Sequence, residues 1–286
     1  MSKKGKKAQA GKPKKLTPKD IGKRLDALVK KLGEELKGAD LFAPIPPAGD
    51  CPICMVPMSR LTQGSYAMAC CGNFICRGCY KENRGYVQKE EKENVCSFCR
   101  SKLRRRFEEG TMQQLGRRIE KHDDPNAYNS LGWMILHGKT KNALKALGYF
   151  IRGAELGSKE ACGNISNCFS DGHGVAQNTE KALFFLRIAA LRGGVISHHN
   201  VGCHEYDLGN YDIAIRHWKL AAEVGSQFSL DQLKRIYNAG GREPGREFIS
   251  KDYLDWVYRE CHEAQEEVMT ENREKYCTEE SKIFRC

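Results

Sequence analysis

The chain has 286 residues, of which 40% are hydrophobic and 29% are charged, and its formal net charge is +11. No stretch approaches the roughly 18 consecutive apolar residues of a membrane span, and the lysine-rich N-terminus has no apolar core of a secretory signal. We therefore expect no membrane span and a cytoplasmic or nuclear location. In such a reducing compartment, the paired cysteines among the 14 present are more often metal ligands than disulfides.

The basic character of the chain belongs to its N-terminal end. Residues 1–24 carry a net charge of +9, and the remainder carries only +2. Residues 1–15 contain no apolar anchor, so we expect a disordered basic tail. Such a tail suits nuclear targeting, simple solvation or non-specific nucleic-acid binding through counterion release. It has no interleaved aromatic residues for base stacking, so sequence-specific binding is not indicated.

An amphipathic helix is predicted over residues 16–42. Thr17 can cap it and Pro18 suits its first turn. Apolar residues recur on one stripe at helical spacing, namely Ile21, Leu25, Leu28, Val29, Leu32 and Leu36. A proline-rich linker over residues 43–49 then leads into a cysteine-rich module, residues 50–100.

Eight cysteines lie within 49 residues of this module, as three C-x2-C pairs and one adjacent doublet. They are Cys51, Cys54, Cys70, Cys71, Cys76, Cys79, Cys96 and Cys99. A segment this short buries little apolar surface, and thiolates paired at a two-residue gap suit tetrahedral zinc. We therefore predict two Zn²⁺ ions. A disulfide framework, an iron–sulfur centre and a two-zinc module of another type are the weaker alternatives.

The order and gaps of these cysteines resemble a RING finger of the all-cysteine type. The resemblance implies that the ligand pairs interleave, so that one zinc binds Cys51, Cys54, Cys76 and Cys79, and the other binds Cys70, Cys71, Cys96 and Cys99. Most RING fingers place a histidine where this chain has Asn73. The adjacent doublet leaves open that either Cys70 or Cys71 is a bystander and that Asn73 or another group completes the site.

A RING finger implies a ubiquitin ligase, which binds a ubiquitin-charged conjugating enzyme and acts by positioning its thioester. The resemblance assigns contacts with that enzyme or with ubiquitin to Ile53, Tyr86, Phe98 and Arg100. The alternative for Arg100 is a basic residue that is simply solvated. The chain also departs from the common RING pattern at Ser97, where a proline usually follows the seventh ligand. The module is alternatively a scaffold without ligase activity, so the assignment as an enzyme stays open.

A basic linker helix is predicted over residues 102–125, and residues 126–240 contain an internal repeat. One helix ending recurs around Ala154, Ala190 and Ala222, which lie 36 and 32 residues apart. The helix openings recur as well, at Ala127, Ala161 and Ser197. A period of this length with two helical patterns per unit indicates stacked helical hairpins, an α-solenoid.

These units resemble Sel-1-like repeats, relatives of the tetratricopeptide repeat. The second unit carries most of the pattern, including Gly172-His173-Gly174-Val175 and the closing Ala189-Ala190 with Gly193. We therefore expect a mainly α fold, in which a basic tail and a two-zinc RING-like module precede the solenoid, with a long helix within residues 245–276 at its end. The combination resembles an algal family that joins a RING finger to Sel-1-like repeats.

Two functions follow as hypotheses. The first is a RING-type ubiquitin ligase that recruits a protein substrate through its repeats, and the second is a non-catalytic, zinc-dependent protein-interaction scaffold. A nucleic-acid adaptor acting through the basic tail is a third. A cluster of His198, His199, Cys203 and His204 in the third repeat is interpreted as ordinary packing, because no further ligand converges on it.

Overall fold

The computed structural model describes residues 17–58, 65–76, 78–80, 95–96, 98–101, 107–138, 141–239 and 244–267. In chain order its elements are α1 (Pro18–Leu36), β1 (Ser65–Ala67), β2 (Phe74–Cys76), α3 (Phe107–His122), α4 (Pro125–His137), α5 (Ala143–Glu155), α6 (Lys159–Asp171), α7 (Thr179–Leu191), α8 (Val195–Asp207), α9 (Tyr211–Glu223), α10 (Gln227–Asn238), the 3-10 turn η1 (Arg246–Phe248) and α11 (Lys251–Glu267). The predicted tail, residues 1–15, lies outside the described residues.

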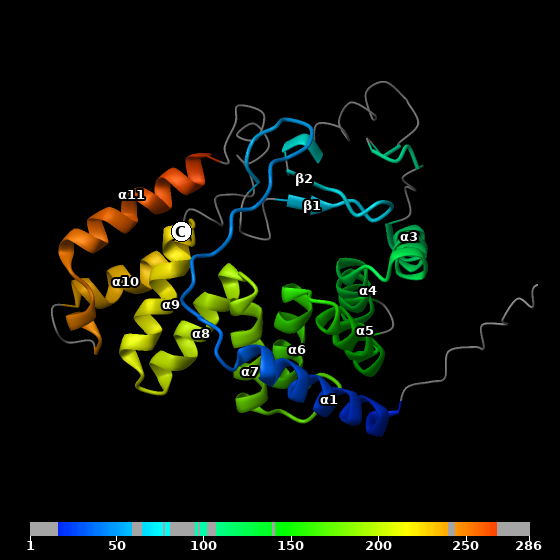
Figure 1. Cartoon of the computed structure of the whole chain (residues 1–286), viewed down its shortest axis with the longest axis horizontal. Coiled ribbons are helices and arrows are strands. Elements are labelled where there is room, and N and C mark those ends of the chain that lie inside the picture. The colour runs from blue at the N-terminus through cyan, green and yellow to red at the C-terminus, as the bar shows by residue number, and fades with distance from the viewer. Residues whose placement is uncertain are drawn as a thin grey trace, which may run out of the picture.

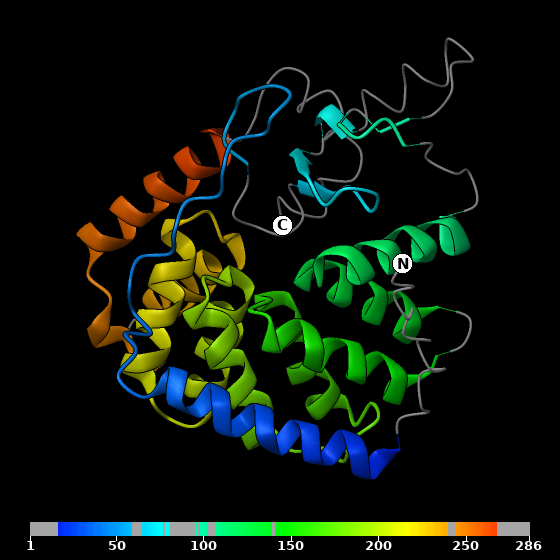
Figure 2. The ribbon, with the colours of Figure 1, turned by 45° about the vertical axis from the view of Figure 1, so that its right-hand side comes forward.

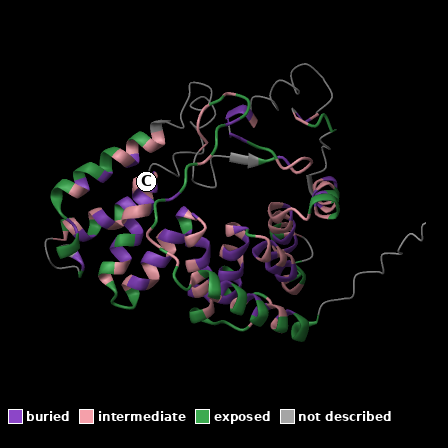
Figure 3. Ribbon diagram, in the orientation of Figure 1, coloured by how far each residue is buried: buried purple, intermediate pink, exposed green. Residues whose placement is uncertain are grey.

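Helices α4 to α9 form three antiparallel hairpins that stack in sequence order (Figure 1). Helix α4 pairs with α5, α6 with α7, and α8 with α9, and each hairpin also packs on the next. Helix α10 continues the stack, and α11 packs against α9 and α10. The predicted mainly α fold with a solenoid of helical hairpins is therefore confirmed. Buried residues follow the contacting faces of these helices (Figure 3).

The two helices of a hairpin approach closely because a small residue faces a large one. A Cβ atom added to Gly132 would lie 2.6 Å from Phe150, and one added to Gly202 would lie 2.5 Å from the indole nitrogen of Trp218. In the middle hairpin the glycine position holds the larger Ser166, and the aromatic position holds Leu186, which is smaller than Phe150 or Trp218. Core volume is therefore balanced within each unit, as close packing requires.

Each hairpin ends at a glycine that leaves the helical conformation. Gly157, Gly193 and Gly225 have φ angles of 101°, 79° and 96°. A glycine adopts this left-handed region without the steric cost that a Cβ atom imposes. The closing glycines of the sequence repeat thus turn the chain into the next hairpin.

Helix α1 lies across the second helices α5 and α7 (Figures 1 and 2). Thr17 and Asp20 form a capping box at its start, and its buried face consists of Ile21, Leu25, Leu28 and Leu32. It is held further by Arg192, whose guanidinium donates to both carboxylate oxygens of Glu35. The helix ends at Leu36 and not near residue 42, because Gly38 turns the chain with a φ of 84°.

An extended segment then runs from α1 along the solenoid to the cysteine module (Figure 1). Ile45 is buried against Val195 and Ala221. Phe42 stacks on the guanidinium of Arg216, 3.6 Å from ring centroid to carbon, and its ring lies beside His217. Residues remote in sequence therefore tie the N-terminal segment to the third repeat.

The described parts of the other two predicted helices lie inside their predicted ranges. Within 102–125 the structure has α3, and Asp123, with a φ of 48°, separates it from α4. Within 245–276 it has α11, and residues 268–276 lie outside the described part of the chain. Among the described residues, no helix combines the length and apolar character needed to cross a membrane.

Two buried histidines join α8 to α9. His198 Nδ1 and His217 Nδ1 are 2.9 Å apart, and both side chains are about 1% exposed. His198 also hydrogen-bonds the backbone of Ala190. A neutral imidazole has one N–H donor and one acceptor nitrogen, so one ring of the pair donates and the other accepts. Burial lowers the pKa of His198 to about 4 and, together with the neighbouring charge of His198, that of His217 to about 3.

Substituting Gly202 tests the close approach of the helices. Gly202→Ala should lower the free energy of unfolding by about 1–3 kcal/mol, because the methyl group displaces Trp218. Gly163→Ala on α6 is the matched control: no atom lies within 4 Å of its added Cβ, so helix propensity should raise stability by about 0.5–1 kcal/mol. Urea unfolding followed by circular dichroism measures both, and equal effects would contradict the packing argument.

Acidification should destabilise the repeats through the histidine pair. As pH falls below about 6.5, these histidines become protonated in the unfolded chain, whereas in the folded chain they stay neutral down to about pH 4. The free energy of unfolding should therefore fall by up to about 1.4 kcal/mol per pH unit for each histidine. Urea unfolding at several pH values, followed by tryptophan fluorescence, measures the slope.

The double variant His198→Gln with His217→Gln is the control for this slope. Glutamine amides can form a donor–acceptor pair but do not titrate in this range. Protonation of Glu205, which pairs with Arg187 beside the histidines, would act in both proteins. A pH slope as steep in the double variant as in the original chain would remove the histidine pair as its cause.

Candidate metal centre

The first C-x2-C loop has a tightly bonded backbone. Cys51 N donates to Val56 O at 2.9 Å, and Met55 N donates to Cys51 O at 2.8 Å. Met55 adopts a left-handed φ of 54°. This turn points the sulfurs of Cys51 and Cys54 toward the same side, where the loop can offer two ligands to one ion.

The last C-x2-C loop repeats the same turn. Cys96 N donates to Ser101 O at 2.9 Å, and Arg100 N donates to Cys96 O at 3.1 Å. Arg100 has a φ of 58°, the counterpart of Met55. A non-glycine residue in this region costs roughly 1–2 kcal/mol, so the surrounding turn must hold it there.

The antiparallel hairpin β1–β2 carries the central cysteines. Cys70 and Cys71 lie in the turn between the strands, and Cys76 ends β2. Met68 N donates to Asn73 O at 2.9 Å and closes this turn. Cys79 follows on a short helical turn over residues 78–80.

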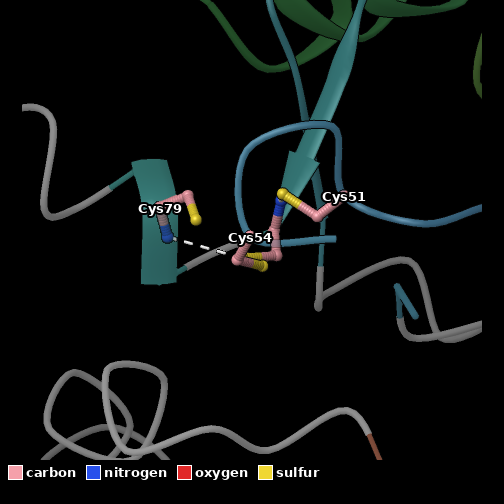
Figure 4. Close-up of side chains that lie close together, drawn as sticks. Cys51, Cys54 and Cys79 are labelled. Carbon is pink, nitrogen blue, oxygen red and sulfur yellow. Dashed lines mark hydrogen bonds between the residues drawn. The ribbon is translucent and has the colours of Figure 1, made fainter. Parts of the chain in front are cut away.

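The sulfurs gather in two groups of four, and the pairs interleave. One group is Cys51, Cys54, Cys76 and Cys79, and the other is Cys70, Cys71, Cys96 and Cys99. Figure 4 shows Cys79, on its helical turn, facing the loop that carries Cys51 and Cys54. The structure thus brings together the same sets that the RING resemblance implies, with both members of the doublet in the second group.

The spacing of the sulfurs suits a tetrahedral ion. All ligand atoms of a group lie within 4.8 Å of one another. The sulfurs of Cys54 and Cys76 are 3.8 Å apart, as are those of Cys71 and Cys96. A zinc ion with sulfur ligands at 2.3 Å defines a tetrahedron whose edges measure about 3.8 Å. Both groups therefore fit a metal ion of this size and preference.

The sulfurs within a group differ in how readily they ionise. Burial disfavours the Cys51 thiolate, but backbone N–H donors, foremost that of Cys76, lower its pKa to about 6. Burial also opposes ionisation of Cys99, and hydrogen bonding with Ser101 lowers its pKa to about 7. Burial and the neighbouring sulfurs raise the pKa values of Cys70 and Cys79. A bound cation would compensate this repulsion between thiolates.

The residues assigned to a conjugating enzyme have different environments. Ile53 is 44% exposed in the first loop, and Arg100 is exposed after the last. Phe98 is half-buried and packs against the cysteine core. Tyr86 lies outside the described residues. The sequence interpretation missed Met55, which is 72% exposed beside Ile53; its place directly after a C-x2-C pair was the available signal.

A second omission is Arg118 of α3. It is only 4% exposed and contacts both the cysteine module and the start of α4. Nothing in the basic sequence around it distinguishes it from Arg117, which is exposed. The weak sequence signal for a buried basic partner was Asp124, an acidic helix cap directly before Pro125.

The histidine–cysteine cluster of the third repeat has no metal-like arrangement. Cys203 Sγ lies 3.6 Å from His199 Nε2, and His199 Nδ1 lies 3.0 Å from Ser229 Oγ. Burial raises the pKa of Cys203 and lowers that of His199. Both groups therefore stay neutral, as packing residues do.

Comparison with known proteins identifies the helical part. The family model described as Sel1 repeat matches residues 125–158, 159–194 and 197–226, segments that do not include the cysteine module. No curated protein matches the chain.

Two solved structures resemble the chain over about half its length. A Sel1 repeat protein from Oxalobacter formigenes is 22% identical with a TM-score of 0.46, covering 54% of this chain and 64% of that one. The protective antigen c5321 of uropathogenic Escherichia coli, described as displaying an SLR fold, is 24% identical with a TM-score of 0.44, covering 53% and 33%. The match thus spans less than two thirds of either protein's length.

The hairpins of α4 to α9 form an α-solenoid, the class of protein that offers extended surfaces to partners. Its three units are Sel1 repeats, as the sequence pattern predicted. Such repeats imply protein–protein interaction, and the two cysteine groups beside them are suited to holding metal ions.

Metal analysis of cysteine variants tests the two groups. The purified chain should contain two zinc ions, Cys76→Ser one or none, and Cys70→Ser and Cys71→Ser each one. Each structural zinc contributes roughly 10–16 kcal/mol of apparent binding energy, so loss of one ligand should be measurable by elemental analysis. Cys203→Ser, on α8, should retain both ions. A full complement of zinc in Cys70→Ser would assign that residue as a bystander.

Proposed function

We propose that this chain is a RING-type ubiquitin ligase in which a two-zinc module positions a charged conjugating enzyme and the Sel1 repeats bind the protein substrate. The observation that carries the proposal is the interleaving of the cysteine pairs, first with third and second with fourth. Two separate C-x2-C modules would instead bring sequence neighbours together. Interleaved ligation ties distant loops into one rigid surface, which catalysis by positioning requires.

The surface around the first group supports the proposal. Ile53 and Met55 present exposed apolar side chains on the same loop. An exposed apolar pair on a small module suits a contact with another protein. Arg100 stands on the other C-x2-C loop, where its exposed guanidinium can donate to two partners at once.

The repeats offer their first helices to a partner. Helix α1 covers part of the second-helix face, over α5 and α7. Exposed large apolar side chains of the repeats and their continuation include Trp133 on α4, Ile196 on α8 and Phe228 on α10, with Leu208 at the end of α8. Apolar side chains on an uncovered face are the ordinary means by which helical repeats bind a protein segment.

Ubiquitylation with purified components tests the proposal. With a panel of conjugating enzymes, the chain should form ubiquitin conjugates, and Ile53→Ala and Arg100→Asn should reduce the rate by about tenfold or more. Asparagine tolerates the left-handed conformation of position 100, so this variant removes the charge and keeps the turn. Cys76→Ser should abolish transfer.

The matched control for Ile53 is Phe248→Ala. Phe248 is 43% exposed, close to the 44% of Ile53, but lies in η1 beyond the repeats. It should not alter self-ubiquitylation. Absence of transfer across the panel, from protein that contains two zinc ions, would replace the ligase with the non-catalytic interaction scaffold.

A further inference from the structure

Arg118 occupies the junction between the cysteine module and the solenoid. Its helix α3 packs on α4, and its side chain is 95% buried. Its Nη1 donates to Met68 O of the module at 3.4 Å, and its Nη2 pairs with the Asp124 carboxylate. One guanidinium therefore contacts both parts of the chain.

On the module side, Arg118 holds the turn that carries the adjacent cysteines. The carbonyl of Met68 also accepts from Cys71 N at 3.2 Å and from Gly72 N at 2.7 Å. The guanidinium lies directly against Gly72, where an added Cβ atom would be 2.6 Å from Nη2. The position of Cys71 and the position of Arg118 are thus fixed by the same carbonyl.

On the solenoid side, Arg118 holds the cap of the first repeat. The Asp124 carboxylate accepts from Asn126 N at 2.8 Å and from Ala127 N at 3.1 Å at the start of α4. Burial alone would raise the pKa of Asp124, but these bonds and the Arg118 guanidinium lower it. The cap is therefore a carboxylate over the ordinary pH range and can pair with Arg118.

The charge on α3 complements a metal bound by the second group. A cavity of about 580 Å³ separates them, lined by Cys70, Cys71 and Cys99 and by Arg117, Arg118 and Lys121. A divalent ion with four thiolates carries a net charge of −2. Cations across a cavity of this size favour that charge, and no Asp or Glu is among the described residues that line it.

We propose that Arg118 is a positioning residue that couples the second cysteine group to the first repeat, so that metal bound there latches the module onto the solenoid. The inference rests on the metal binding of the proposed function. The coupling applies to the second cysteine group and not to the first, because the turn that Arg118 holds carries Cys70 and Cys71, which belong to the second group. Partners that hold ligand-bearing segments in place typically alter metal affinity by 10–100-fold when removed.

The test uses the full chain loaded with zinc and compares Arg118→Met with Arg152→Met. Arg152 is the matched control because it pairs with Asp123, next to Asp124, and with Glu155, on the solenoid side of the junction. Alkylation of cysteines, followed by mass spectrometry, reports metal protection of each group separately. Hydrogen exchange of the first turn of α4 reports the solenoid end.

Arg118→Met should raise the alkylation rate of the second group by about tenfold and leave the first group unchanged. Chelation should speed hydrogen exchange in the first turn of α4 in the original chain but not in Arg118→Met, where exchange is already fast. Asp124→Asn, which keeps a capping side chain, should uncouple exchange from chelation in the same way. Arg152→Met should leave alkylation of both groups and the response to chelation unchanged.

If the cysteines of each group are alkylated as slowly in Arg118→Met as in the original chain, the coupling is overturned and metal binding is left intact. An effect of Arg152→Met as large as that of Arg118→Met would also overturn it, because general destabilisation would then explain both. A purified original chain without metal would overturn the coupling together with the proposed two-zinc module.

Discussion

The close approach of the two helices in each hairpin underlies the rest of the structure. Gly132 and Gly202 leave room for Phe150 and Trp218, and without that space the hairpins would splay apart and lose the faces on which the next unit stacks. The stack in turn supplies the second-helix face that buries the apolar stripe of α1. It also places the start of α4 where Arg118 of α3 links it to the cysteine module.

The cysteine module follows a different constraint, because its short loops bury little apolar surface. Its buried residues are largely the sulfurs themselves with Met68 and Ile75. Four thiols within 4.8 Å repel one another once ionised, so a cation is what would make the arrangement favourable. Folding of the module would thereby be linked to a bound metal, whereas the solenoid has an apolar core of its own.

Contacts distant in sequence join these two parts. Arg118 bonds the cysteine turn to the cap of α4, and the segment after α1 carries Phe42 and Ile45 along the third repeat before it enters the module. The module is thus approached from both of its ends by chain that is packed on the solenoid. Two partners, one bound to each part, would therefore be held at a defined separation, which a flexible linker does not provide.

The sequence by itself determined the repeat, its period, the recurring helix openings and endings and the pairing of cysteines at two-residue gaps, because each is a local pattern. The interleaving rested on a resemblance, since spacing alone does not say which pairs share an ion. Only the tertiary structure decided that Arg118 is buried while Arg117 is exposed, and that His198 meets His217 while the adjacent His199 meets Ser229. Neighbouring residues of one type look alike in sequence, and the helix packed against them decides which is desolvated.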